Sequence, residues 1–198
     1  MPRRRERVIP SPVDLSRTTG TLMLADVTVG RNMGGVKQGQ IKRLLILESL
    51  PKPINYTGSM EPMSYGGTFT LERILGTVPV EEDGSAHFTV PAYRELFFQA
   101  LDERGMAITS MRSGTHARHG ERLVCQGCHE HKSQATKVPA ALPLALRREP
   151  SRPVPDVDGS NPFSYPRLVQ TVLDRNCVQC HDENKDKKAP NLGREPIA

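Results

Sequence analysis

The hydrophobic residues between positions 22 and 111 come in short runs that are separated by turn-forming residues. Segment 86–90 alternates apolar and polar residues, which is typical of a strand with one buried face. The expected strands are 22–29, 41–48, 69–80, 86–90, 96–101 and 106–111. Several short strands at this spacing predict a small antiparallel β-sandwich-like domain.

A helical pattern replaces this strand pattern near the C-terminus. Five apolar residues fall at the spacing of one helix face, and they are Tyr165, Leu168, Val169, Val172 and Leu173. Pro166 suits the first turn of such a helix. The sequence therefore predicts a mostly β protein with an α-helical C-terminal part, in which the helix leads directly into a cysteine motif.

All four cysteines belong to two copies of the pattern Cys-x-x-Cys-His, at 125–129 and 177–181. This pattern is the attachment signature of c-type haem, because two thiols three positions apart can add to two vinyl groups on one porphyrin edge. The adjacent histidine can then ligate the iron. The sequence predicts two covalent haem c groups, attached through Cys125, Cys128, Cys177 and Cys180 and ligated by His129 and His181.

Other chemistry is compatible with paired cysteines. A zinc site remains an alternative, although 48 residues separate Cys128 from Cys177, against roughly 15 to 20 in the usual zinc-ribbon spacing. A zinc site also does not require a histidine directly after the second cysteine of each pair. A thioredoxin-like pair would need a βαβ context that the pattern does not contain, and disulfide frameworks belong to shorter, cysteine-dense chains.

Further histidines are candidates for the sixth position on either iron. His116 and His119 precede the first motif, and His131 follows His129 by two residues. A loop histidine in such a place can equally contact a haem propionate or water. Two loop methionines, Met60 and Met63, are weaker candidates, and His87 falls on the polar face of its strand and is expected at the surface.

Composition and charge narrow the possible functions. Hydrophobic residues make up 36% of the chain and Trp is absent, so the core is lean and the C-terminal half is expected to fold poorly without cofactor. The net charge of +5 is dispersed and no nucleic-acid-binding motif accompanies it, so nucleic acid is not an expected partner. No apolar run is long enough to span a membrane.

The N-terminus lacks the apolar segment of a signal peptide. This conflicts with c-type haem, which bacteria attach outside the cytoplasm. We therefore expect the chain to be a fragment or to have lost an upstream export signal, with a cytoplasmic metal protein as the competing interpretation. The expected organisation is a flexible arm (1–20), a β-rich domain ending in the first motif (21–135), a Pro-rich linker (136–162) and a truncated cytochrome c-like unit (163–198).

Segments 76–88, 97–102, 110–113 and 125–130 together resemble the middle domain of hydrazine synthase alpha-subunit-like proteins, which are multihaem proteins. Segment 173–181 is similar to the cytochrome c modules that follow that domain. The resemblance covers about residues 22 to 195. It implies haem at both motifs, an upstream propeller domain and export to a periplasmic or similar extracytoplasmic compartment. Hydrazine synthesis itself is not carried over, because the sequence identifies no substrate pocket.

These observations favour an extracytoplasmic dihaem c-type protein that exchanges electrons with a redox partner protein, with other subunits or a propeller domain as further partners. One alternative is a haem redox enzyme subunit, in which one iron lacks a sixth protein ligand and activates a small nitrogen or oxygen species. Another is a zinc-stabilised binding module. Whether the protein is an enzyme is left open.

Overall fold

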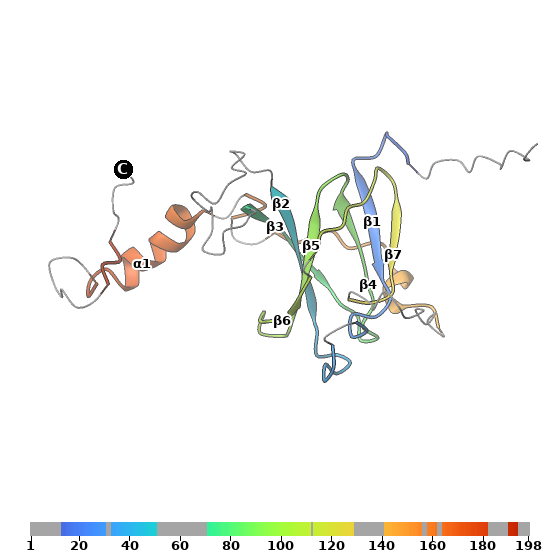
Figure 1. Cartoon of the computed structure of the whole chain (residues 1–198), viewed down its shortest axis with the longest axis horizontal. Helices are drawn as coiled ribbons and strands as arrows, with labels where there is room; N and C mark the ends of the chain where they lie inside the picture. Colours follow the sequence, from blue (N-terminus) through green and yellow to red (C-terminus); the bar gives the residue numbers. More distant parts are fainter. Residues whose placement is uncertain are drawn as a thin grey trace, which may run out of the picture.

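The computed structural model describes residues 13–30, 33–50, 71–111, 113–128, 141–155, 158–161, 164–181 and 190–193. Two β-sheets face each other in this part of the chain (Figure 1). One sheet has the order β4-β1-β7, built from Ala86–Pro91, Thr19–Leu24 and Arg122–Cys125. The other has the order β3-β2-β5-β6, built from Leu71–Pro79, Arg43–Leu50, Leu96–Leu101 and Ala107–Ser110.

The strand pairing is mostly antiparallel. Strand β2 pairs antiparallel with β3 and β5, and β5 pairs antiparallel with β6. Strand β1 pairs antiparallel with β4 but parallel with β7. The predicted β-sandwich is therefore confirmed, with β1 and β7 as the one parallel pair of named strands.

The core lies between the two sheets and follows the period-two alternation of the strands. On β4 the side chains of Ala86, Phe88 and Val90 are buried, with at most 1% of each residue exposed. The rings of Phe88 and Phe98 meet edge to face with centroids 5.6 Å apart, which joins the two sheets. Burying each large apolar side chain contributes about 1.5–3 kcal/mol to stability.

Strand β7 is an element that the hydrophobic pattern did not predict. Its four residues lie outside the six strands expected from the sequence. They pair with β1, so that Leu24 lies opposite Cys125. A strand this short, formed with a partner about a hundred positions earlier, has little local signal in the sequence. The first motif consequently starts on a strand.

Residues 141–155, named the strap here, run along the edges of both sheets. The strap contains a 3-10 turn at Leu144–Arg147 and then extends. Ser151 exchanges two backbone hydrogen bonds with β4, and Val154 exchanges two with Thr77 of β3, at 2.9–3.0 Å. Gly76 permits this approach, because a Cβ there would lie 2.4 Å from the Val154 carbonyl oxygen. The strap therefore ties β4 to β3.

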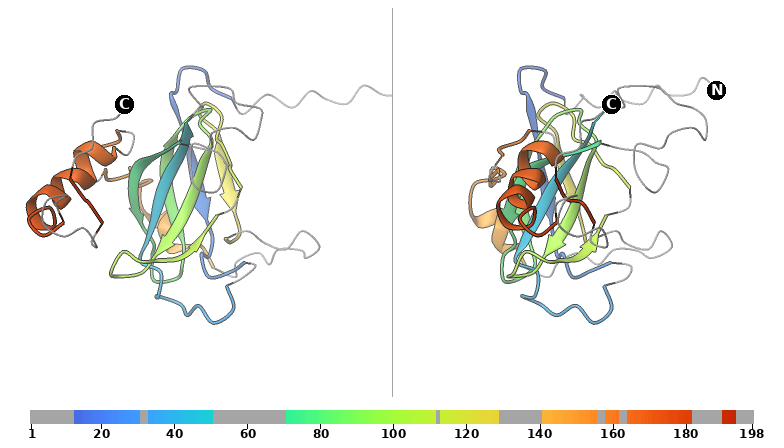
Figure 2. Two further views of the ribbon diagram at one scale, coloured as in Figure 1. Left: turned by 60° about the vertical axis from the view of Figure 1, so that its left-hand side comes forward. Right: turned by 90° about the vertical axis from the view of Figure 1, so that its left-hand side faces the viewer.

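The C-terminal helix lies to one side of the two sheets (Figure 2). It begins with a π-helical turn at Tyr165–Val169 and continues as α1, Gln170–Asn176. The predicted helix is thus confirmed. Among the described residues, no helix has the length and hydrophobicity that a bilayer crossing requires.

Candidate haem-binding motifs

The first motif is attached to the sandwich through backbone hydrogen bonds. Ala25 N–H donates to the Cys125 carbonyl at 2.9 Å, and Asp26 N–H donates to the Gln126 carbonyl at 3.1 Å. Cys128 N–H donates to the Val29 carbonyl at 2.6 Å. These three backbone hydrogen bonds hold the motif against the loop that follows β1.

Glycine makes this contact possible. A Cβ at Gly127 would lie 2.2 Å from the Val29 carbonyl oxygen, and a Cβ at Gly30 would lie 2.1 Å from the Cys128 carbonyl oxygen. No real Cβ approaches a backbone oxygen so closely. The side chains of Cys125 and Cys128 are half-buried and pack beside the hydrophobic core. His129, His131, Met60 and Met63 lie outside the described residues.

The second motif forms a turn at the end of helix α1. Cys177 N–H donates to the Leu173 carbonyl at 2.8 Å, and His181 N–H donates to the Cys177 carbonyl at 2.9 Å. This turn places the cysteine and the histidine one helical turn apart. Cys177 is half-buried, Cys180 is exposed, and none of the four cysteines forms a disulfide.

The imidazole of His181 has a defined orientation. Its Nδ1 lies 3.2 Å from the Pro190 carbonyl oxygen, which accepts the Nδ1–H, and the Leu192 N–H donates to the His181 carbonyl at 3.0 Å. Histidines that ligate metals usually donate their other ring N–H to a carbonyl or carboxylate, which fixes the ring and the tautomer. With Nδ1 engaged in this way, Nε2 is the nitrogen left to ligate a metal.

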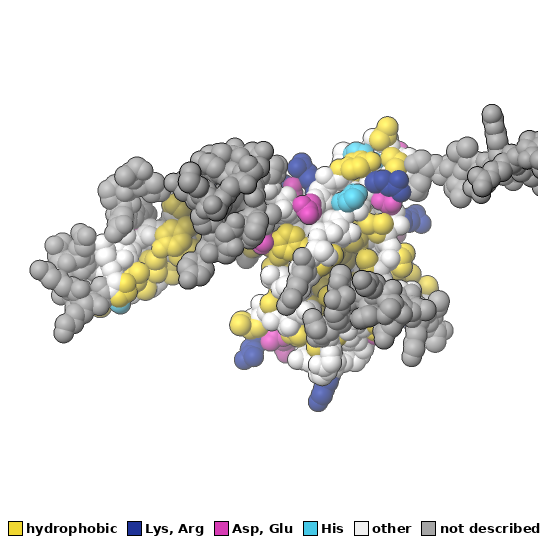
Figure 3. All heavy atoms as spheres, viewed as in Figure 1, with side chains coloured by type: hydrophobic (Ala, Val, Ile, Leu, Met, Phe, Trp, Pro, Cys, Tyr) yellow, Lys and Arg dark blue, Asp and Glu magenta, His cyan; other side chains and the backbone are white. Residues whose placement is uncertain are grey.

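The apolar face of the helix is only partly covered by the described part of the chain. Of the five apolar residues predicted on that face, none is fully buried, and Tyr165 and Val172 are 53% and 55% exposed. Figure 3 shows hydrophobic side chains along this helix at the surface. A porphyrin supplies a large apolar surface that such a face can pack against. The thiols, the oriented imidazole and the apolar face together fit a haem c.

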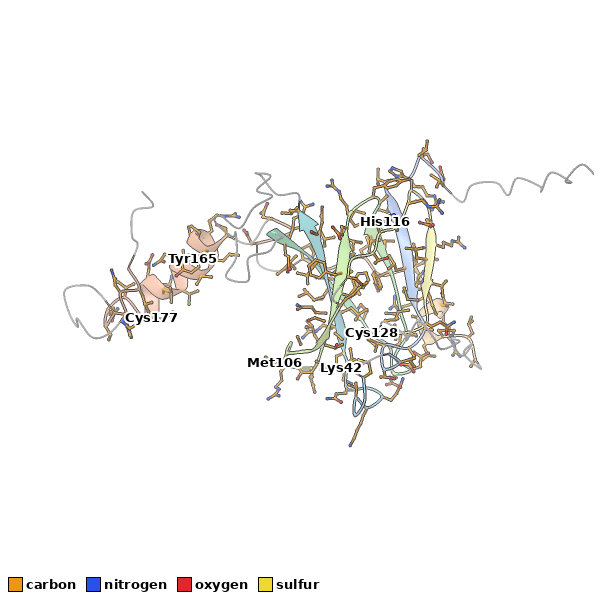
Figure 4. All side chains as sticks on the ribbon, in the orientation of Figure 1. Lys42, Met106, His116, Cys128, Tyr165 and Cys177 are labelled. Carbon is orange, nitrogen blue, oxygen red and sulfur yellow. The ribbon has the colours of Figure 1, made fainter. Side chains whose placement is uncertain are left out.

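His116 and His119 lie together but away from the first motif. Both rings pack on Tyr93, with centroids 6.4 and 5.1 Å from its ring. The Nδ1 of His119 also donates to the Arg17 carbonyl. Figure 4 shows His116 at one end of the sandwich and Cys128 toward the other. The structure therefore does not bring these two histidines to the thiols of the first motif.

His87 is less exposed than its place on the polar face of β4 suggested. It is half-buried in a groove of about 940 Å³ between the outer face of its sheet and the strap, lined also by Met23, Thr89, Arg122, Leu142 and Arg148. Burial lowers the pKa of His87, and the guanidinium of Arg148 acts in the same direction. The alternation along β4 correctly placed His87 on the outer face of the strand. It could not predict that the strap covers this face.

The two cysteine pairs lie in different parts of the molecule (Figure 4). The structure therefore does not gather the four thiols into one site of the kind that a shared zinc ion would need. Within the described ranges, no three His, Cys, Asp or Glu side chains cluster closely enough to hold a metal ion.

Comparisons with known proteins agree with the β-sandwich fold. Residues 39–130 match the family model of the hydrazine synthase alpha subunit middle domain. Residues 39–130 are therefore similar to the middle domain of the hydrazine synthase alpha subunit, which confirms the resemblance found in the sequence.

The fold is also similar to a solved structure. The match is a chain of Kuenenia stuttgartiensis hydrazine synthase, with a TM-score of 0.70, 22% identity and 98% of the present chain covered. The present chain spans only 32% of that chain. No curated protein matches the sequence.

Proposed function

We propose that the chain carries two covalent c-type haems and passes electrons one at a time between a redox partner protein and the two irons. The observation that carries the proposal is the geometry of the second motif. Two thiols and one imidazole lie within one turn at the end of a helix whose apolar face is only partly covered, and the Pro190 carbonyl orients that imidazole through Nδ1. Haem iron supplies one-electron redox chemistry in such a site.

The protein residues have separate roles in this proposal. Each thiol adds its S–H across one porphyrin vinyl group, so that a C–S bond forms at one carbon and the hydrogen goes to the other. This addition needs no oxidant and releases no leaving group. Cys177 and Cys180 would fix the cofactor in the second site, and Cys125 and Cys128 would do so in the first.

The site of action belongs to the same proposal. Bacteria attach c-type haem outside the cytoplasm, so we propose a periplasmic or similar extracytoplasmic location. Further subunits, or a propeller domain of the kind that the family resemblance implies, are the proposed assembly partners.

The test is a visible absorption spectrum with haem quantitation, after expression with an export signal in a host that matures cytochromes c. We expect two covalent haems per chain, one of which is lost in Cys125→Ala and the other in Cys177→Ala. A colourless, folded chain that contains zinc would overturn the proposal and favour the metal-stabilised binding module.

Carbon monoxide separates electron transfer from catalysis at the iron. If each iron carries two axial ligands from the protein, added carbon monoxide leaves the spectrum of the reduced protein unchanged. A shifted Soret band would show an open position, and the chain would then fit a haem enzyme subunit acting on a small nitrogen or oxygen species.

A further inference from the structure

The buried side chain of helix α1 is a polar one. Gln170 is 6% exposed, whereas the apolar residues of the same helix are half-buried or exposed. Burying an amide raises the free energy of the folded state unless the amide is hydrogen-bonded. We therefore expect a buried glutamine to have hydrogen-bond partners. The burial of Gln170 therefore indicates that the hydrogen bonds of its amide stabilise this region.

Gln170 joins the helix to a distant segment of the chain. Its Nε2 donates to the Leu192 carbonyl at 2.9 Å and to Asp174 Oδ1 at 2.9 Å. Both protons of the amide are thus used. One bond lies within the helix, and the other anchors the segment 190–193 to it.

The anchored segment also contacts His181. The Leu192 N–H donates to the His181 carbonyl at 3.0 Å, and the Pro190 carbonyl accepts the Nδ1–H of His181 at 3.2 Å. Gly193 N–H donates to Asn191 Oδ1 at 2.9 Å, which gives the segment a compact turn of its own. The 190–193 segment therefore links the Gln170 amide, bound at Leu192, to the ring of His181, bound at Pro190.

We propose that Gln170 is a positioning residue for the second iron. It holds the 190–193 segment so that the Pro190 carbonyl meets Nδ1 of His181 and Nε2 faces the metal. This inference rests on the proposed haem at Cys177 and Cys180. A carbonyl acceptor at Nδ1 makes the imidazole more basic, and a more basic ligand stabilises Fe(III) over Fe(II).

Replacing the amide tests the role directly. Gln170→Leu keeps the size and the helix propensity of the side chain but removes both donors. We expect the midpoint potential of one of the two haems to rise, with a change of up to about tenfold in the Fe(III)/Fe(II) equilibrium, or about 59 mV. The potential of the other haem stays unchanged. The measurement is a spectroelectrochemical titration of the full, haem-loaded chain.

The matched control is Thr171→Val. Thr171 Oγ1 donates to the carbonyls of Arg167 and Leu168, at 2.9 and 3.2 Å, within the same helical segment. The substitution Thr171→Val removes a neighbouring hydrogen bond that also runs from a side chain to a backbone carbonyl. Both haem potentials should remain those of the unmodified chain, which separates positioning of the ligand from a general loosening of the helix.

Gln170→Asn is the second variant and guards against a Gln170→Leu chain that does not fold. It keeps an amide but shortens the side chain by one methylene, and we expect a smaller shift in the same direction. Unchanged potentials in both Gln170 variants, or an equal shift in Thr171→Val, would overturn the positioning role while the dihaem proposal stands. A chain with no haem at the second motif would overturn both.

Discussion

The two Cys-x-x-Cys-His motifs have the same pattern of residues but lie on different kinds of backbone. The first begins at the end of strand β7 and is held by three backbone hydrogen bonds to residues 25–29. The second follows a seven-residue helix and is held by its own turn and by the short 190–193 segment. The first motif is part of a packed core, whereas the second depends on a few polar contacts.

This difference indicates what a cofactor would contribute in each place. The sandwich buries its apolar side chains without a ligand, so the first motif has a framework before any haem is attached. The second region buries no apolar side chain of its helix. The cofactor would therefore serve as the core of the second region and as an addition to the first.

The largest expected effect comes from withholding the cofactor. In a chain expressed without cytochrome maturation, residues 164–181 and 190–193 should lose protection from hydrogen exchange, while β1 to β5 keep theirs. A helix of seven residues is too short to be stable alone, and it needs an apolar partner. Comparing exchange in the haem-free and haem-loaded chains is the test. Equal protection of residues 164–181 and 190–193 in both states would contradict it.

A clash at the first motif should have the next largest effect. Gly127→Ala would place a Cβ 2.2 Å from the Val29 carbonyl oxygen and disrupt the bond between Cys128 and Val29. We expect the free energy of unfolding to fall by about 2–3 kcal/mol. Gly34→Ala is the control, because nothing lies within 4 Å of its added Cβ. Urea unfolding measures both, and similar values for the two variants would refute the backbone attachment.

The strap should show a smaller, pH-dependent effect. Burial alone would raise the pKa of Asp83, but hydrogen bonds from Leu144 N–H and from Ser85 outweigh it and leave the pKa lowered. A lowered pKa in the folded state means that the stabilisation is present above the unfolded value of about 3.9 and is lost as the pH falls below it. The effect is about 1 kcal/mol, given the partial exposure.

Exchange of the Leu144 amide, followed from pH 6 to pH 3, measures this contact. Protection of that amide should fall with pH in the unmodified chain and depend much less on pH in Asp83→Asn. Asp102→Asn, in the turn between β5 and β6, is the control and should behave as the unmodified chain does. A pH-independent Leu144 amide in the unmodified chain would count against the role of Asp83.

The smallest effect is expected from the histidines that pack on Tyr93. His116→Ala and His119→Ala should leave both haem spectra unchanged. Both rings pack on Tyr93, and Figure 4 shows His116 away from Cys128. Low-temperature electron paramagnetic resonance of the oxidised protein gives the check. Conversion of either haem from low spin to high spin in one of these variants would identify that histidine as an iron ligand.

The sequence predicted the elements whose signal is local. Alternating residues on β4 and the apolar spacing after Tyr165 gave the correct strand and helix, because each pattern repeats within a few residues. Strand β7 was missed because it is short and its stability comes from distant pairing with β1. The Pro190 and Gln170 contacts around His181 were also missed, since no spacing rule links positions so different in sequence.

The strap has a consequence for association between chains. Strands β4 and β3 are outer strands of their sheets, and an outer strand with unpaired N–H and C=O groups can template pairing with another molecule. Ser151 and Val154 occupy hydrogen-bonding positions on these two strands, and the prolines beside them, Pro150, Pro153 and Pro155, have no N–H to offer a further strand. The strap thereby blocks edge-to-edge pairing of another chain at β4 and β3.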